Sequence, residues 1–173
     1  DEFLIRFVLR SKESLDRLKK GTSAFLELNH EVKVVTANIQ PIHQAIIEGD
    51  EEIVITDQKV IIHQFDEFKL ALGARSFFQV TPSMAKILYD SLSEEVKRDR
   101  PKSLIDLYCG VGAFSFYASR WCNQVVGVEI SKEAIECAEI SNQLNQGKVI
   151  FHALDVGAYL KKNAHYFDAV LIN

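Results

Sequence analysis

The spacing of hydrophobic residues changes near residue 82 of this 173-residue chain. Before that point, short apolar runs alternate with polar turn residues, a pattern typical of strands. A helix is predicted over 11–20, capped by Ser11 and ended by Gly21. We therefore expect residues 1–81 to form a small, mostly antiparallel, β-rich α+β module. The apolar runs predict its strands at 3–9, 32–36, 53–56, 60–65, 68–72 and 77–80.

From Pro82 onward, helix-like and strand-like segments alternate. Pro82 suits the first turn of a helix, which Asp99-Arg-Pro101 then interrupts. The pattern beyond it predicts strands at 103–108, 124–129, 148–153 and 167–172, with helices at 112–121, 131–145 and 155–161. Such alternation indicates right-handed crossovers and a parallel, doubly wound sheet. Residues 82–173 are thus expected to be the N-terminal part of a Rossmann-like domain. Because the chain stops after an apolar strand, we expect it to be a fragment of a longer protein.

Composition narrows the class of protein. With 47% hydrophobic and 25% charged residues, the chain can form a sizeable core. No stretch approaches the roughly 18 apolar residues of a membrane span, and no signal sequence opens the chain, so we expect a cytoplasmic protein without a membrane partner. The cysteines Cys109, Cys122 and Cys137 form no C-x-x-C pair and the histidines have no ligand spacing, which predicts no metal site. A net charge of −4 disfavours an RNA clamp made by this chain alone.

A glycine turn suggests the chemistry of the second part. The segment Asp106-Leu-Tyr-Cys-Gly110-Val-Gly112 follows a predicted strand and opens a predicted helix, and Glu129 ends the next strand. In nucleotide-binding βαβ units, such a turn offers backbone amides to the cofactor and the acid accepts hydrogen bonds from the ribose hydroxyls. The pattern therefore predicts an adenosine-bearing cofactor, and NAD and S-adenosylmethionine both meet it.

Three residues bear on the choice of cofactor. A dinucleotide fingerprint has G-x-G-x-x-G, whereas this chain has Ser115 at the third position, which weakens NAD. Asp106 can orient the turn or receive an ammonium group, directly or through water. S-adenosylmethionine presents such a group and has no pyrophosphate. Asp155, after the third predicted strand, suits the edge of an adenine pocket and equally suits a helix N-cap, and the two roles are compatible.

The glycine turn and an upstream Arg75-Ser-Phe-Phe-Gln79-Val segment together carry a resemblance to a known family. From Phe3 to Asn173 the chain resembles the RNA (uracil-5)-methyltransferases, which make 5-methyluridine in transfer and ribosomal RNA. The segment Asn38-Ile-Gln-Pro-Ile-His43 resembles the 23S rRNA branch. The resemblance implies S-adenosylmethionine as methyl donor and RNA, in this branch 23S rRNA, as partner; it implies no protein partner.

The resemblance also assigns residues. Gln79 matches a glutamine beside the cofactor, Tyr108 the aromatic of the glycine turn, and Asn173 the first residue of an N/D-P-P-R loop. The cofactor-binding residues expected from both arguments are Gln79, Asp106, Tyr108, Gly110, Gly112, Glu129, Asp155 and Asn173.

The family's chemistry implies that no catalytic residue lies within this chain. Family members add a cysteine thiolate to C6 of uracil, which lets C5 attack the methyl group, and a base then removes the C5 proton. The resemblance places this cysteine and base after Asn173, and it leaves Cys109 a packing role. Many members also carry an N-terminal iron–sulfur cluster. One is possible in the full-length protein, but its cysteine spacing does not occur in this chain.

The sequence also allows two other functions. One is a different adenosine-cofactor enzyme, such as an NAD-dependent oxidoreductase or a small-molecule methyltransferase, against which Ser115 and the β-rich module argue. The other is a non-catalytic RNA-binding module, which the net charge of −4 disfavours.

Overall fold

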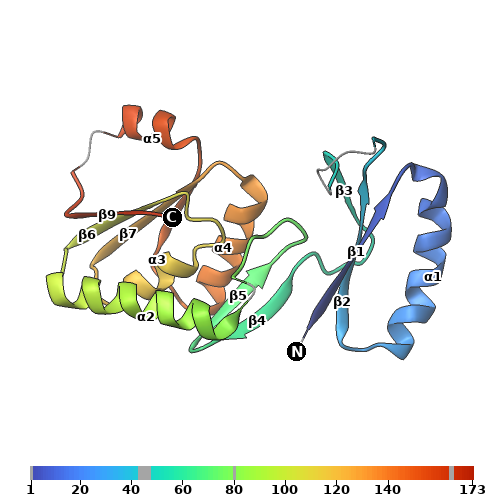
Figure 1. Ribbon diagram of the computed structural model, residues 1–173, viewed down its shortest axis with the longest axis horizontal. Coiled ribbons are helices and arrows are strands. Elements are labelled where there is room, and N and C mark those ends of the chain that lie inside the picture. The colour runs from blue at the N-terminus through green and yellow to red at the C-terminus, as the bar shows by residue number, and fades with distance from the viewer. Residues whose placement is uncertain (1, 43–47, 80, 164–165) are drawn as a thin grey trace. The chain divides into compact units, whose positions relative to one another are not determined.

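The computed structural model describes residues 2–42, 48–79, 81–163 and 166–173, so His43, Val80 and His165 lie outside the described residues. The chain divides into two compact units, residues 1–63 and 64–173 (Figure 1). The sequence pattern had placed the boundary at residue 82. The second unit begins earlier because the strand β5 (Phe68–Leu72) packs against the helix α4 (Lys132–Leu144).

The first unit is a sheet in the order β1-β2-β3 with one helix. Its elements are β1 (Phe3–Leu9), the 3₁₀ turn η1 (Lys12–Ser14), α1 (Leu15–Leu28), β2 (Val32–Ile39) and β3 (Glu51–Val54). β2 and β3 are antiparallel, but β1 and β2 are parallel, so the expectation of a mostly antiparallel module is wrong for that pair. The reason is α1, which returns the chain to the starting end of the sheet as a βαβ crossover.

The helix α1 does not end at Gly21, as the sequence had suggested, but continues to Leu28. Leu18, Thr22 and Phe25 follow one another at helical spacing and line a groove against the sheet. A glycine inside a helix costs only about 1 kcal/mol relative to alanine. Tertiary packing on both sides of Gly21 therefore outweighs its tendency to stop the helix.

The second unit is a parallel sheet in the order β8-β7-β6-β9, which confirms the predicted doubly wound architecture. The strand β4 (Ile61–Phe65), which pairs with β5, spans the division between the units. The elements after β5 are α2 (Pro82–Asp99), β6 (Ser103–Leu107), α3 (Ala113–Ala118), β7 (Gln124–Glu129), α4, β8 (Ile150–Ala153), α5 (Val156–Lys162) and β9 (Ala169–Ile172). The strand predicted over 77–80 is wrong for its described part, because residues 77–79 adopt no strand.

Helices cover the two faces of this sheet unequally (Figure 1). Leu104 and Val125 face the core formed with α2, α3 and α4, while Ile105 and Val126 face α5. Successive residues of a strand point to opposite faces, which is why neighbours in sequence join different cores. Across the described ranges, no helix has both the length and the apolar composition to cross a bilayer.

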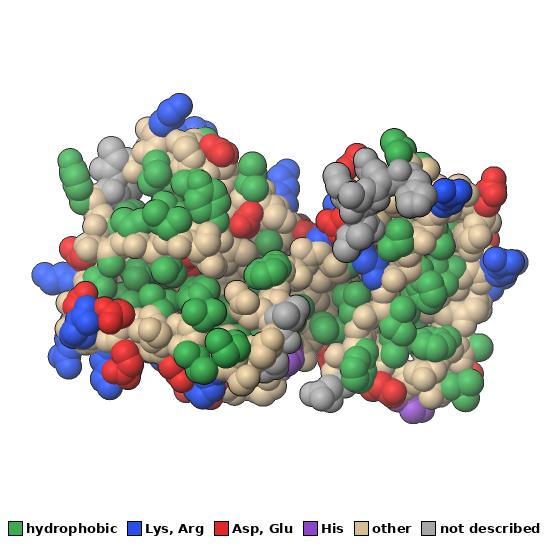
Figure 2. Space-filling model, viewed as in Figure 1, with side chains coloured by type: hydrophobic (Ala, Val, Ile, Leu, Met, Phe, Trp, Pro, Cys, Tyr) green, Lys and Arg blue, Asp and Glu red, His purple; other side chains and the backbone are tan. Residues whose placement is uncertain are grey.

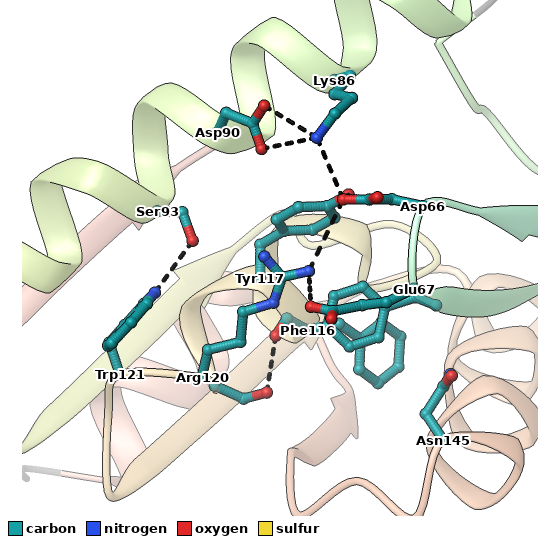
Figure 3. A network of polar contacts seen from close by, with 12 residues as sticks. Asp66, Glu67, Lys86, Asp90, Ser93, Phe116, Tyr117, Arg120, Trp121 and Asn145 are labelled. Atoms are coloured by element: carbon teal, nitrogen blue, oxygen red, sulfur yellow. Dashed lines mark hydrogen bonds and ion pairs between the residues drawn. The ribbon is translucent and has the colours of Figure 1, made fainter.

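A polar network fixes the β4–β5 turn to α2 and α3 (Figure 3). The Lys86 ammonium and the Tyr117 hydroxyl each donate a 3.2 Å hydrogen bond to Oδ2 of Asp66. Arg120 pairs with Glu67 and stacks over the Tyr117 ring at 4.3 Å. These contacts attach the β4–β5 turn to the second unit, of which it is part.

Candidate cofactor-binding site

The expected site residues of the second unit follow the carboxyl ends of its parallel strands. Tyr108 to Gly112 follow β6, Glu129 ends β7, Asp155 follows β8 and Asn173 follows β9. The strand order reverses at β6, whose neighbours are β7 and β9. In open α/β sheets, ligands bind outside the carboxyl ends of the strands at this switch point. The fold therefore brings these residues to the edge where a ligand is expected.

Left-handed backbone shapes the glycine turn. Tyr108, Gly110 and Gly112 have φ of 64°, 54° and 82°. A Cβ on Gly112 would lie 2.6 Å from the Phe151 ring, whereas a Cβ on Gly110 would meet none of the described atoms within 4 Å. Gly112 is thus required for packing of the turn against β8. Gly110 leaves space on the other side, where a ligand can approach the backbone.

The carboxylate of Glu129 connects the glycine turn to the start of α4. Its Oε2 accepts a 3.2 Å hydrogen bond from the Gly110 amide and its Oε1 a 2.9 Å bond from the Ser131 amide. Ser131 in turn caps α4 through its hydroxyl. A carboxylate has about four lone-pair sites, so each oxygen keeps acceptor capacity after these bonds. Held in this way, Glu129 fits a pair of neighbouring hydroxyls such as those of a ribose.

Asp106 lies beneath the turn and is completely buried. Its Oδ2 accepts a 2.6 Å hydrogen bond from the Ser115 hydroxyl, while Oδ1 has no hydrogen-bond partner among the described residues. Burial, with a further contribution from the charge of Glu129, raises the pKa of Asp106 to about 7, although its hydrogen bonds with Ser115 oppose the shift. An unsatisfied buried carboxylate oxygen is suited to an ammonium group or a water molecule that bridges to one.

Gln79 and Asn173 are brought together although they are far apart in sequence. Both line a small cavity of about 40 Å³ that also includes Cys109 and Phe78. The Asn173 amide donates a 3.2 Å hydrogen bond to the Leu107 carbonyl, which fixes it at the end of β6. The structure therefore places both expected residues beside the glycine turn.

The neighbouring rings Phe77 and Phe78 take different environments. Phe78 packs edge-to-face on Phe65 with ring centroids 5.3 Å apart, whereas Phe77 is 76% exposed. Both also line the cavity beside Gln79.

Asp155 is the N-cap of α5, because its Oδ1 accepts a 2.8 Å hydrogen bond from the Ala158 amide. The capping role that the sequence allowed is thus confirmed. The side chain is exposed at the edge of the sheet that carries Glu129, so its second oxygen remains accessible to a ligand.

The cysteines of the second unit are poorly suited to nucleophilic attack in this structure. Burial raises the pKa of the Cys109 thiol far above its usual value, and the charges of Asp106 and Glu129 raise it further. Burial likewise raises the pKa of Cys122 and Cys137. A thiol with a raised pKa carries little thiolate at neutral pH.

Within the part of the chain that is described, no group of His, Cys, Asp and Glu side chains is arranged to hold a metal ion.

Three residues of the site's framework were missed from the sequence. Ser115 was noted only as a departure from a glycine pattern, yet it is the hydrogen-bond donor to Asp106. Ser131 links Glu129 to α4, and Glu133 accepts a 3.2 Å hydrogen bond from the Arg75 amide. Polar residues repeating at four-residue spacing on the buried side of α4 were the signal that could have identified Glu133.

The family model and the similar proteins both name RNA uracil-5 methyltransferases. Residues 23–153 match the sequence model of the tRNA (Uracil-5-)-methyltransferase family. Two enzymes named 23S rRNA (uracil(747)-C(5))-methyltransferase are similar to it: that of Vibrio vulnificus is 38% identical over 99% of this chain and 46% of its own length. That of Shewanella sp. is 41% identical over 99% of this chain and 45% of its own length. The chain therefore spans about half the length of the curated relatives it matches.

A solved structure supports the fold. The chain superposes on the Pyrococcus abyssi tRNA (uracil-54, C5)-methyltransferase in complex with S-adenosyl-L-homocysteine with a TM-score of 0.62 and 22% identity. The likeness covers 80% of this chain and 33% of that one. At 22% identity, this likeness is evidence for the fold only. It confirms the predicted Rossmann-like methyltransferase sheet.

Proposed function

The chain belongs to the tRNA (uracil-5-)-methyltransferase family, and from this we propose that it binds S-adenosylmethionine for methylation of C5 of a uridine in 23S rRNA. The family match supports the reaction, and the two curated relatives support the ribosomal RNA as substrate. We also propose that the reaction takes place in the cytoplasm, which a ribosomal RNA substrate favours. Because the relatives are about twice as long, the activity is proposed for the whole protein and donor binding for this chain.

The residues at the carboxyl edge of the sheet suit the donor. Glu129 would accept hydrogen bonds from the ribose hydroxyls, and Asp155 would contact the adenine. The buried oxygen of Asp106 would receive the ammonium group, directly or through water. Gln79 and Tyr108 would border the sulfonium end of the donor. When bound, S-adenosylmethionine supplies an electrophilic methyl group.

One observation carries the assignment within the chain: Glu129 is held by the Gly110 and Ser131 amides at the end of β7, beside a turn whose Gly110 side is open. Two backbone donors fix the carboxylate before any ligand binds. A preorganised acceptor loses little conformational freedom on binding, which favours affinity. NAD would need the same acid, but Ser115 stands where its fingerprint has a third glycine.

We propose that activation of the uracil ring depends on groups beyond the described residues of this chain. Uracil C5 is a weak nucleophile until a thiolate adds to C6. Cys109 is buried and its raised pKa keeps it protonated, so we assign it no part in this addition. The resemblance places the nucleophilic cysteine and the base after Asn173. The 173 residues therefore would hold the donor and not activate the uridine.

Binding of the rRNA is proposed to depend on more than these residues. On the face that Figure 2 shows, lysine and arginine side chains lie among acidic ones and do not gather in one basic patch. The net charge is −4. Non-specific affinity for RNA comes mainly from lysine and arginine contacts to phosphates. We expect the chain alone to bind an rRNA hairpin weakly, with affinity falling steeply as salt rises.

Calorimetry tests donor binding. We expect S-adenosylhomocysteine to bind and NAD not to bind. Glu129→Ala should weaken binding at least tenfold, because it removes about two hydrogen bonds to the ribose. Glu136→Ala, which removes an exposed carboxylate on α4, is the matched control and should bind normally. Binding of NAD without S-adenosylhomocysteine would overturn the proposal.

The methylation itself is tested on the full-length protein. A 23S rRNA transcript lacking modifications and a transfer RNA transcript are each incubated with S-adenosylmethionine and digested to nucleosides. Mass spectrometry should detect 5-methyluridine from the 23S rRNA. Product from the transfer RNA alone would refute the substrate assignment while leaving donor binding intact.

A further inference from the structure

Four side chains at four-residue spacing on α4 and its C-cap contact β5 or the turn that follows it. At one end, Asn145 and the backbone of Lys69 exchange two hydrogen bonds, of 2.9 Å from the Lys69 amide and 2.7 Å to its carbonyl. Next, the Ser141 hydroxyl accepts a 2.8 Å hydrogen bond from the Ala71 amide. We call these residues the α4 ladder; its members are Glu133, Cys137, Ser141 and Asn145.

The ladder continues into the turn after β5. The Gly73 amide donates a 2.8 Å hydrogen bond to the Ser76 hydroxyl, and that hydroxyl lies 3.6 Å from the Cys137 sulfur. At the far end, Oε1 of Glu133 accepts a 3.2 Å hydrogen bond from the Arg75 amide. Alternate residues from Lys69 to Arg75 are thus held, directly or through Ser76, by successive turns of one helix.

The geometry explains why a helix can replace a neighbouring strand here. Four helical residues advance about 6 Å, and two strand residues advance about 6.6 Å. The two repeats nearly coincide, so side chains four residues apart, Ser141 and Asn145, can accept from strand amides two residues apart, those of Ala71 and Lys69. The pairing also covers an edge that would otherwise remain open.

The contact between Glu133 and the Arg75 amide lies next to the candidate site. Arg75 precedes the segment Ser76-Phe-Phe-Gln79, of which residues 77–79 line the cavity shared with Cys109 and Asn173. The approach is close, since a Cβ on Gly73 would lie 2.8 Å from Oε1 of Glu133. The same helix begins beside Glu129, whose carboxylate accepts from the Ser131 amide. One helix therefore connects the acid proposed to bind ribose with the segment that carries Gln79.

We propose that the α4 ladder positions Gln79 against the methyl-donor site and that Glu133 is the positioning residue at its functional end. The inference rests on the proposed function, because it takes Gln79 to contact the donor. Glu133 touches neither the reacting atoms nor the donor and acts through the Arg75 backbone. Since Arg75 is exposed and Glu133 half-exposed, the loss of this bond should loosen residues 75–79 more than it destabilises the fold.

The test compares two substitutions of Glu133. Glu133→Ala removes the acceptor, and we expect the dissociation constant for S-adenosylhomocysteine to rise about five- to tenfold, the effect of losing one hydrogen bond. Glu133→Gln keeps a side-chain oxygen that can accept from the Arg75 amide, so its affinity should stay within about twofold of the parent. Glu136→Ala on the exposed face of α4 is the control. Amide hydrogen exchange at Arg75 should accelerate in Glu133→Ala and not in Glu133→Gln.

A double substitution separates positioning from general loosening. If Glu133 acts through Gln79, then Glu133→Ala should weaken binding little further in a Gln79→Ala background. Additive losses would overturn the inference, as would normal binding by Glu133→Ala when Gln79→Ala binds weakly. If the parent protein binds no S-adenosylhomocysteine, the proposed function fails and the positioning role fails with it. If the parent binds and Glu133→Ala binds equally well, only the ladder's role fails.

Discussion

The Ser115 hydroxyl donates a 2.6 Å hydrogen bond to Oδ2 of Asp106, and both side chains are fully buried. The pair joins the start of α3 to the central strand β6 directly beneath the glycine turn. Oδ1 lacks a hydrogen-bond partner among the described residues, so only one of the two carboxyl oxygens is hydrogen-bonded. A buried carboxyl of this kind favours its neutral form. The ionisation of Asp106 therefore depends on pH and on any positive charge nearby.

Stability is expected to fall as pH rises towards neutrality because of Asp106. Burial raises its pKa from 3.8 to about 7 in the folded protein. Between these values the folded state holds a proton that the unfolded state has released, so the free energy of unfolding decreases by about 1.4 kcal/mol per pH unit. Asp106→Asn is nearly isosteric and does not titrate. Denaturant unfolding from pH 4.5 to 8 should show that the difference between parent and variant follows this slope; parallel curves would contradict it.

Binding of the donor should respond to the same group in the opposite direction. If Asp106 receives the ammonium group, its ionised form binds better, so affinity for S-adenosylhomocysteine should increase as pH rises through about 7. Asp106→Asn should remove this dependence. Calorimetry in buffers of different ionisation enthalpy should also detect proton release on binding by the parent. Equal pH profiles for parent and variant would exclude contact between Asp106 and the ligand's charge.

The two glycines of the turn should differ in their tolerance of a side chain. Gly112→Ala places a Cβ 2.6 Å from the Phe151 ring at a left-handed φ of 82°. Strain and overpacking together should cost about 3 kcal/mol of unfolding free energy. Gly110→Ala has the strain without the clash and should cost about 1 kcal/mol. Chemical denaturation measures both, and equal losses would show that Phe151 can move aside.

Tyr108 combines a left-handed φ of 64° with a ring that is 52% exposed. At a position with ordinary negative φ, a protein with glycine is less stable than the same protein with alanine. At a left-handed position, the protein with glycine is the more stable of the two. We therefore expect Tyr108→Gly to be more stable than Tyr108→Ala by about 1 kcal/mol. Both should lose affinity for S-adenosylhomocysteine if the ring borders the donor. Thermal unfolding and calorimetry on the same pair separate the two effects, and Tyr108→Phe serves as the control.

Cys109 should be dispensable for the methyl transfer. Its thiol is buried and its pKa is far above neutrality. In the full-length protein, Cys109→Ala should therefore retain formation of 5-methyluridine. In the folded parent, iodoacetamide should modify the partly exposed Cys122 before Cys109 and Cys137. An inactive but normally folded Cys109→Ala would identify this residue as a nucleophile.

Several features followed from the sequence because their causes are local. Alternating strands and helices predicted the parallel sheet, and Pro82 and Asp155 marked helix starts that the structure contains. Other expectations failed where distant packing intervened. Gly21 did not end α1 because residues on both sides of it pack on the sheet. Residues 77–79 did not form a strand, and they line the cavity beside the glycine turn with Cys109 and Asn173.

The sequence by itself determined the type of each main element and the spacing of Asp106, the glycine turn and Glu129, because strand and helix periods and turn conformations are set within short stretches of chain. Tertiary structure alone decided that Ser115 would donate a hydrogen bond to Asp106, that Gln79 and Asn173 would share a cavity, and that α4 would pair with β5. The first contact joins residues nine positions apart, and the other two join residues far apart in the chain. They depend on how the helices pack on the sheet, and no local pattern of residues specifies that packing.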